Sequence, residues 1–504
     1  MKKLRSNKDL LNNHIEELKQ SIVIDRLNKV EWIMLCIILA FITITLFYDD
    51  NLGMFLSYFW VNNSALHGYN INFLGNNQMT YGIVQQYFGE LWCLPLNIIY
   101  LIHPFTVHCT AAVIWYKLSM VIIFLLSLKE MIKIGKLLGI EEEKIKWMLI
   151  LFCSTILVSL PVFHIAQTDI LYGYLVLVAL RFYTEDNRKR FILFAAMAVS
   201  CKGIALVVII PLILLREKKI FKIFRDILLT FSIFVGERIW YRIVNVLNRA
   251  IFGTKDAVVS AVTSMGTASV NETETASDIV SAGLIPHFYH KALFFEFGAV
   301  RKGYVASLLV FLFALLCIWC YVQKRDDINE FIRTSIYVVA IAWLLFFVNA
   351  SPSPYWIVVM YPFLFLMMFM NYDRIRINLL LESGFTLTMF LVYLVDTFWV
   401  YGGANNLDYL ILKGIVPEGH VSTTDGPYVA RYLNNLGIGS VMNVITAVCL
   451  ACAVGLIVVN YYKTNIREEL EPKYEKTLMH GFTIFQIGFL YVWYAVVVFV
   501  VSRW

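Results

Sequence analysis

The chain has 504 residues, of which 59% are hydrophobic and only 15% are charged. Soluble globular proteins carry about 45–50% apolar and about 25% charged residues, so this composition predicts a membrane protein. It also argues against a disordered chain, a disulfide scaffold and a nucleic-acid-binding protein, because the net charge of +6 is explained by membrane orientation.

The first thirty residues form a basic, amphipathic segment. Seven Lys and Arg side chains are interspersed with Leu10, Leu11, Ile15 and Leu18, which recur at helical spacing. A helix of this kind lies in the plane of a membrane interface, with its basic side chains toward the head groups. We therefore predict that residues 1–30 are an amphipathic segment on the cytoplasmic face.

Apolar runs occupy much of the remaining chain, and most are long enough to cross ~30 Å of hydrocarbon as helices. They predict an all-α, polytopic transmembrane protein with about 11 spans, at 31–47, 106–128, 146–163, 168–183, 220–240, 303–323, 332–349, 355–372, 378–400, 440–462 and 480–502.

The apolar segment 191–215 needs a different interpretation. As one full crossing it would place the basic residues that follow, from Arg216 to Arg225, on the outer face. Cytoplasmic loops carry the excess of Lys and Arg, so we expect a re-entrant hairpin of two short helices, bent at 201–203. Thirty of the 42 Lys and Arg then lie on the inner side. The N-terminus is predicted to be cytoplasmic.

This topology leaves three long outer segments, at 48–105, 241–302 and 401–439. Loops carry binding and catalytic residues more often than the elements that they connect. We expect the chemistry on this outer face.

Adjacent carboxylates stand where the first span ends. Asp49 and Asp50 follow the predicted span 31–47, separated from it only by Tyr48. Two acids this close raise the pKa of at least one, which suits a general base or a metal ligand. The alternative is a solvated helix terminus whose acids only mark the interface.

A second group of polar residues lies in the short outer turn 164–169, which contains His164, Gln167 and Asp169. An ionisable residue at the edge of hydrocarbon is by default a functional hypothesis. Lys202, at the predicted bend, is a candidate to hold a phosphate. The alternative is that Lys202 and Asp169 neutralise each other and only stabilise the fold.

A third outer turn, 349–356, contains two prolines and Tyr355 between two spans. Its prolines are either helix punctuation or part of a binding loop. Basic residues near the outer face, among them Arg238 and Arg301, are candidates to bind an anionic head group or to anchor the interface.

These features, in this order and on one predicted face, resemble the GT-C superfamily of polytopic glycosyltransferases, over roughly residues 30–375. Asp49-Asp50 match its modified acidic motif, and the stretch to His67-Gly68-Tyr69 is similar to its aromatic first loop. The turn 164–169 is similar to a Gly-Gln-Phe-Asp motif, with Ala166 and Thr168 in place of the glycine and the aromatic residue. The segment from Tyr355 to Tyr361-Pro362 resembles its late outer loop.

The resemblance implies an active site on the outer face of the cytoplasmic membrane, in a catalytic module at 31–375 followed by C-terminal helices at 376–504. It implies inverting transfer of a sugar from a polyprenyl-phosphate donor to a glycan or glycolipid acceptor of the cell envelope. The general base would be Asp50, or else Asp49, with Asp169 as an orienting acid. The implied phosphate-binding residues are Lys202, Arg238 and Arg301, and the implied substrate-binding residues are Tyr69, His164, Gln167 and Tyr355. Whether a divalent cation takes part stays open.

Two other classes fit the composition. A transporter or flippase of lipid-linked sugars would use Asp169 and Lys202 in an ion pathway, but the chain shows no internal repeat. A surface-polysaccharide polymerase or ligase would use arginines in late outer loops, and 401–439 holds only Arg431.

Overall fold

The structure is a computed structural model, and it describes residues 27–46, 53–74, 82–105, 107, 109–252, 308–323, 327–349, 354–396, 435–437, 441–461 and 472–501. Within these ranges the secondary structure is helical and contains no strand. The predicted all-α fold class is therefore confirmed. The predicted interfacial segment 1–30 lies almost wholly outside the described residues.

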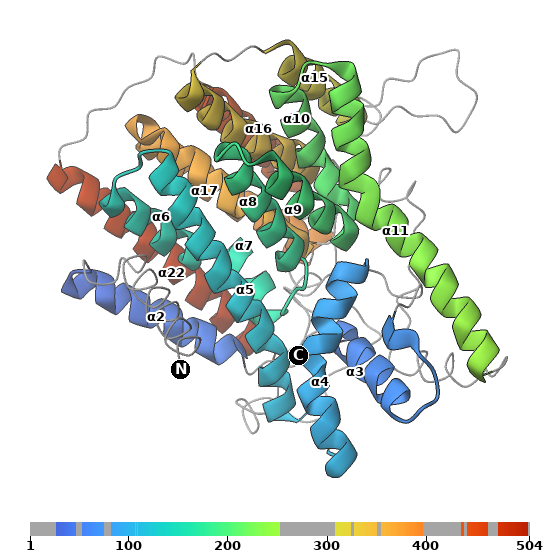
Figure 1. Cartoon of the computed structure of the whole chain (residues 1–504). Coiled ribbons are helices and arrows are strands. Elements are labelled where there is room, and N and C mark those ends of the chain that lie inside the picture. The colour runs from blue at the N-terminus through green and yellow to red at the C-terminus, as the bar shows by residue number, and fades with distance from the viewer. Residues whose placement is uncertain are drawn as a thin grey trace, which may run out of the picture.

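The described residues form a bundle of helices (Figure 1). Its first half comprises α2 (Lys29–Leu46), α3 (Gly53–Leu66), η2 (Asn72–Leu74), α4 (Ile83–Ile102), α5 (Thr110–Leu137), α6 (Glu142–Ser154), α7 (Ile156–Ser159), η3 (Leu160–His164) and α8 (Ile170–Thr184). The second half comprises α9 (Arg188–Cys201), η4 (Gly203–Ala205), α10 (Leu206–Arg216), α11 (Ile220–Phe252), α15 (Leu308–Val322), α16 (Ile328–Asn349), η5 (Pro354–Val359), α17 (Tyr361–Met370), η6 (Tyr372–Arg374), α18 (Ile375–Asp396), α21 (Met442–Val459) and α22 (Pro472–Val501).

Several of these helices have the length and hydropathy to cross a membrane. In the described residues the criteria are met by the segments Ala111–Leu137, Ile328–Val348, Tyr372–Tyr393 and Met442–Val459. Large apolar side chains on outward faces, such as Val444 and Val454 of α21, are exposed, as lipid-facing residues would be. These features are consistent with a membrane protein.

The predicted span 146–163 is not straight. The chain bends by 67° between α6 and the helical segment Ile156–His164. The next predicted span is short, because the 15 residues of α8 rise only ~22 Å. The total of about 11 crossings therefore stays a prediction.

The segment 191–215 is broken where the charge argument placed the bend. α9 ends at Cys201, Lys202 is extended, and α10 begins at Leu206 after one turn of 3₁₀ helix. The far ends of this hairpin lie close together, since Arg216 of α10 forms an ion pair of 3.3 Å with Asp186, just before α9. The chain thus returns to the side from which it came.

The segment 48–105, which we predicted to be a long outer loop, contains two helices, α3 and α4. They pack tightly, and an added Cβ on Gly89 of α4 would lie 2.1 Å from the ring of Tyr58 in α3. α4 also packs against α9, which brings this segment to the Lys202 bend.

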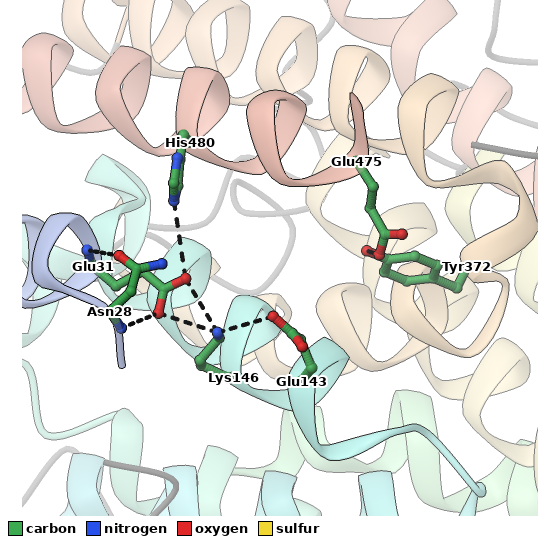
Figure 2. A network of polar contacts seen from close by, with 7 residues as sticks. All are labelled: Asn28, Glu31, Glu143, Lys146, Tyr372, Glu475 and His480. Atoms are coloured by element: carbon green, nitrogen blue, oxygen red, sulfur yellow. Dashed lines mark hydrogen bonds and ion pairs between the residues drawn. The ribbon is translucent and has the colours of Figure 1, made fainter. Parts of the chain in front are cut away.

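A buried ionic network joins three helices at one end of the bundle (Figure 2). Asn28 and Glu31 form a capping box at the start of α2, through hydrogen bonds of 2.9 and 3.0 Å. The fully buried Glu31 carboxylate lies 3.1 Å from Lys146 Nζ of α6. His480 of α22 lies 3.9 Å from the same carboxylate. The network ties the first and last described helices to α6.

We expect Lys146→Met to destabilise the protein by about 3–5 kcal/mol, because it leaves the Glu31 carboxylate buried without its cation. The midpoint of thermal unfolding in detergent measures this. Lys136→Met is the control, since Lys136 pairs with Glu142 at 3.7 Å in an exposed position and such pairs contribute about 0–1 kcal/mol. Equal midpoints for the two variants would refute a stabilising role for the network.

Candidate functional site

The turn 164–169 is held in an unusual backbone conformation. It follows the single π-helical turn η3, and such turns are frequent at functional sites. Ala166 has a φ of 54°, in the left-handed region where a side chain is unfavourable. The Gln167 N–H donates to the Pro161 carbonyl at 2.9 Å, which closes the turn. This geometry places Asp169 at the start of α8, fully buried.

Asp169 and Lys202 form an ion pair inside the bundle. Lys202 Nζ lies 2.8 Å from Asp169 Oδ1, and the Gln167 side-chain amide donates to Oδ2. Both carboxylate oxygens are therefore satisfied, as a buried charge requires. The Lys202 side chain is 16% exposed, so the cation lies at the edge of the interior. The pair fits both interpretations drawn from the sequence, a functional one and a structural one.

The late outer turn also reaches this place. The Lys202 ammonium lies 3.2 Å from the centroid of the Trp356 ring, a cation–π contact, and Tyr172 of α8 flanks it at 5.8 Å. Tyr355, a predicted substrate-binding residue, is buried beside Trp356. The turns 164–169 and 349–356, both singled out in the sequence, thus contact Lys202 at the predicted bend.

The segment before α4 adds residues that the sequence interpretation missed. Gly82 N–H donates to the Cys201 carbonyl at 3.4 Å. Glu237 of α11 accepts hydrogen bonds from the Ser200 hydroxyl at 2.6 Å and from the Ile83 N–H at 3.0 Å. Glu237 is buried, so its carboxylate fastens α4 and the end of α9 to α11. The signal in the sequence that could have identified Glu237 is an acidic residue within the apolar stretch 220–240.

A second link joins α4 to the aspartate-bearing turn. Gln85 of α4 is fully buried, and its amide donates to the Thr168 hydroxyl at 2.6 Å. α4 therefore forms one wall of the site around Asp169 and Lys202.

The remaining predicted residues are distributed differently. Tyr69 is 67% exposed and stacks on His67. Arg238, next to Glu237, is exposed with its guanidinium 5.0 Å from the Phe234 ring. The His164 carbonyl accepts a hydrogen bond from Lys117 at 2.7 Å. The predicted residues that lie outside the described part of the chain are Asp49, Asp50 and Arg301.

Comparison of the chain with known protein families, with curated proteins and with solved structures found no match. In the part of the chain that is described, no three His, Cys, Asp or Glu side chains gather as metal ligands would. The adjacent acids Asp49 and Asp50 lie outside that part.

Gly82→Ala is expected to force α4 away from α9, because the added Cβ would lie 1.7 Å from the Ser200 carbonyl oxygen. Overpacking of this kind costs about 1–3 kcal/mol, and thermal unfolding in detergent measures it. Gly203→Ala is the matched control, since no atom lies within 4 Å of its added Cβ. A Gly82→Ala variant as stable as the control would show that this close approach is absent in solution.

Proposed function

We propose that this chain is an integral membrane glycosyltransferase that transfers a sugar from a polyprenyl-phosphate donor to a cell-envelope acceptor. The proposal combines the resemblance to the GT-C superfamily with one observation. The observation is that Asp169 contacts both Lys202 and Gln167, with Trp356 from the late outer turn on the same lysine. Such a convergence of polar groups in an apolar bundle is typical of a binding site.

In the proposed reaction an acceptor hydroxyl attacks the anomeric carbon of the donor sugar. Asp50 takes the hydroxyl proton, the new carbon–oxygen bond forms, and the bond to the phosphate oxygen breaks on the opposite face. The polyprenyl phosphate leaves with the bonding electrons. A base held in place contributes about 10²–10⁴-fold to the rate.

Lys202 would stabilise the negative charge that develops on the phosphate. Its ammonium is fixed by Asp169 and Trp356, so little reorganisation is needed when the charge develops. Asp169 reduces the net attraction of this lysine for an anion, so a second cation is needed. Arg238 and Arg301 fill that role in the proposal.

The transporter alternative rests on the same buried pair. A transporter moves a lipid-linked sugar without breaking it, whereas the proposed enzyme releases polyprenyl phosphate. Incubating the purified protein with a panel of polyprenyl-phosphate monosaccharides and acceptors separates the two. Release of lipid phosphate supports the enzyme, and intact donor throughout the panel would contradict it.

Asp50→Asn is expected to abolish transfer while leaving expression and membrane insertion unchanged, because the amide cannot accept the proton. Turnover of the polyprenyl-phosphate sugar by the purified variant measures this. Asp49→Asn is the matched control and should retain far more activity. Full activity in Asp50→Asn would refute its assignment as the base.

The structural and functional interpretations of the Asp169–Lys202 pair are separated by neutralising it in steps. Lys202→Gln alone leaves Asp169 buried without its cation and should both destabilise the protein and lower kcat by roughly 10²-fold or more. Lys202→Gln with Asp169→Asn leaves no unpaired charge, so the thermal midpoint should recover. If kcat recovers as well, the pair is only structural.

A further inference from the structure

Lys117 is a completely buried lysine near the site, and the sequence interpretation assigned it no role. It belongs to α5 and lies within the apolar segment Ala111–Leu137, with 0% of its surface exposed. A buried ammonium is costly unless its donors are satisfied. Its partners therefore indicate why it is there.

The Lys117 ammonium donates to backbone carbonyls of two helix ends. It lies 3.0 Å from the Thr45 oxygen, 3.3 Å from the Phe163 oxygen and 2.7 Å from the His164 oxygen. Thr45 is in the last turn of α2, and the other two residues end η3. The last carbonyls of a helix lack intrahelical donors and carry partial negative charge, so a cation with three N–H groups suits them.

The two helix ends lead directly to residues of the site. The chain that leaves η3 at His164 turns through Ala166 and reaches Asp169 within five residues. The turn is backed by α2, which packs against η3. Through Asp169 the geometry of this turn also sets the position of Lys202, 2.8 Å away.

We propose that Lys117 is a positioning residue, which holds the turn 164–169 and thereby the Asp169–Lys202 pair against the end of α2. It acts through the backbone of η3, whose last two carbonyls accept its hydrogen bonds. The inference adds a residue to the proposed site and rests on the proposed function for its effect on catalysis.

The arrangement can be measured without any assay of activity. Spin labels are introduced as unnatural amino acids at Thr43 and Gly203, so that the nine cysteines remain. Thr43 is exposed in the last turn of α2, and an added Cβ at Gly203 has no atom within 4 Å. Pulsed electron paramagnetic resonance then reports the distances between the end of α2 and the residue after Lys202.

We expect a narrow distance distribution in the parent protein and at least a two-fold broader one in Lys117→Met. Lys136→Met, at the other end of α5, is the matched control and should leave the width unchanged, since Lys136 is exposed. If Lys117→Met does not fold, the same distances are measured in Lys117→Gln, because the glutamine amide can donate to some of the three carbonyls. A distribution as narrow as the parent's in the folded variant would overturn the proposal.

Chemical rescue tests whether the cation itself is needed. In Lys117→Ala, propylammonium should narrow the distribution again, whereas tetramethylammonium, which has no N–H donor, should not. Equal effects of the two ions would count against the assigned role.

A kinetic measurement links the position to the reaction. Displacement of a positioned group by about 1 Å can cost on the order of 10²-fold in rate, so Lys117→Met should lower kcat about 10–100-fold. Its KM for the donor should change much less. Because a loss of folded protein alone would also lower the apparent kcat at constant KM, kcat is calculated per folded protein, with the folded fraction measured by thermal unfolding. Unchanged kcat with a broadened distribution would remove the catalytic part of the inference. If the parent protein transfers no sugar at all, the proposed function fails, while the distance measurement still decides the role of Lys117.

Discussion

The site depends on one contact, the 2.8 Å ion pair between Asp169 and Lys202. An unpaired charge at this depth would strongly destabilise the fold, so the pair constrains the positions of the segments that bear its two residues. It fixes the start of α8 to the bend between α9 and α10. Because Trp356 covers the same ammonium, the pair also fixes the late outer turn. Three segments far apart in the sequence are thus held by two opposite charges.

The buried charges of Glu31, Lys146 and Lys117 are satisfied in different ways from that of Lys202. The difference indicates which of these residues only stabilise the fold. Glu31 and Lys146 are paired and almost fully enclosed, which suits a permanent link between helices. Lys117 donates to three backbone carbonyls at helix ends. Lys202 is the one of these cations with appreciable exposure, 16%, and so can meet a ligand. The partial exposure of Lys202 supports the phosphate-binding role proposed for it.

Backbone conformation supports the same location. Left-handed Ala166 stores strain that a glycine would avoid. Gly82 lies directly against the Ser200 carbonyl, where no side chain fits. Both positions border the Asp169–Lys202 pair. Two constrained backbone positions therefore border the residues proposed to act.

The sequence by itself determined the helical class. In lipid, the backbone N–H and C=O groups of a long apolar run must bond to each other, and a helix does this within one segment. It also determined the break near Lys202, because the distribution of Lys and Arg is inconsistent with a straight crossing there. Only the tertiary structure decided that Trp356, Gln85 and Glu237 meet at this bend, since these contacts depend on how distant helices pack. It also decided which carbonyls accept hydrogen bonds from Lys117, because every residue carries a backbone carbonyl and the sequence does not distinguish among them.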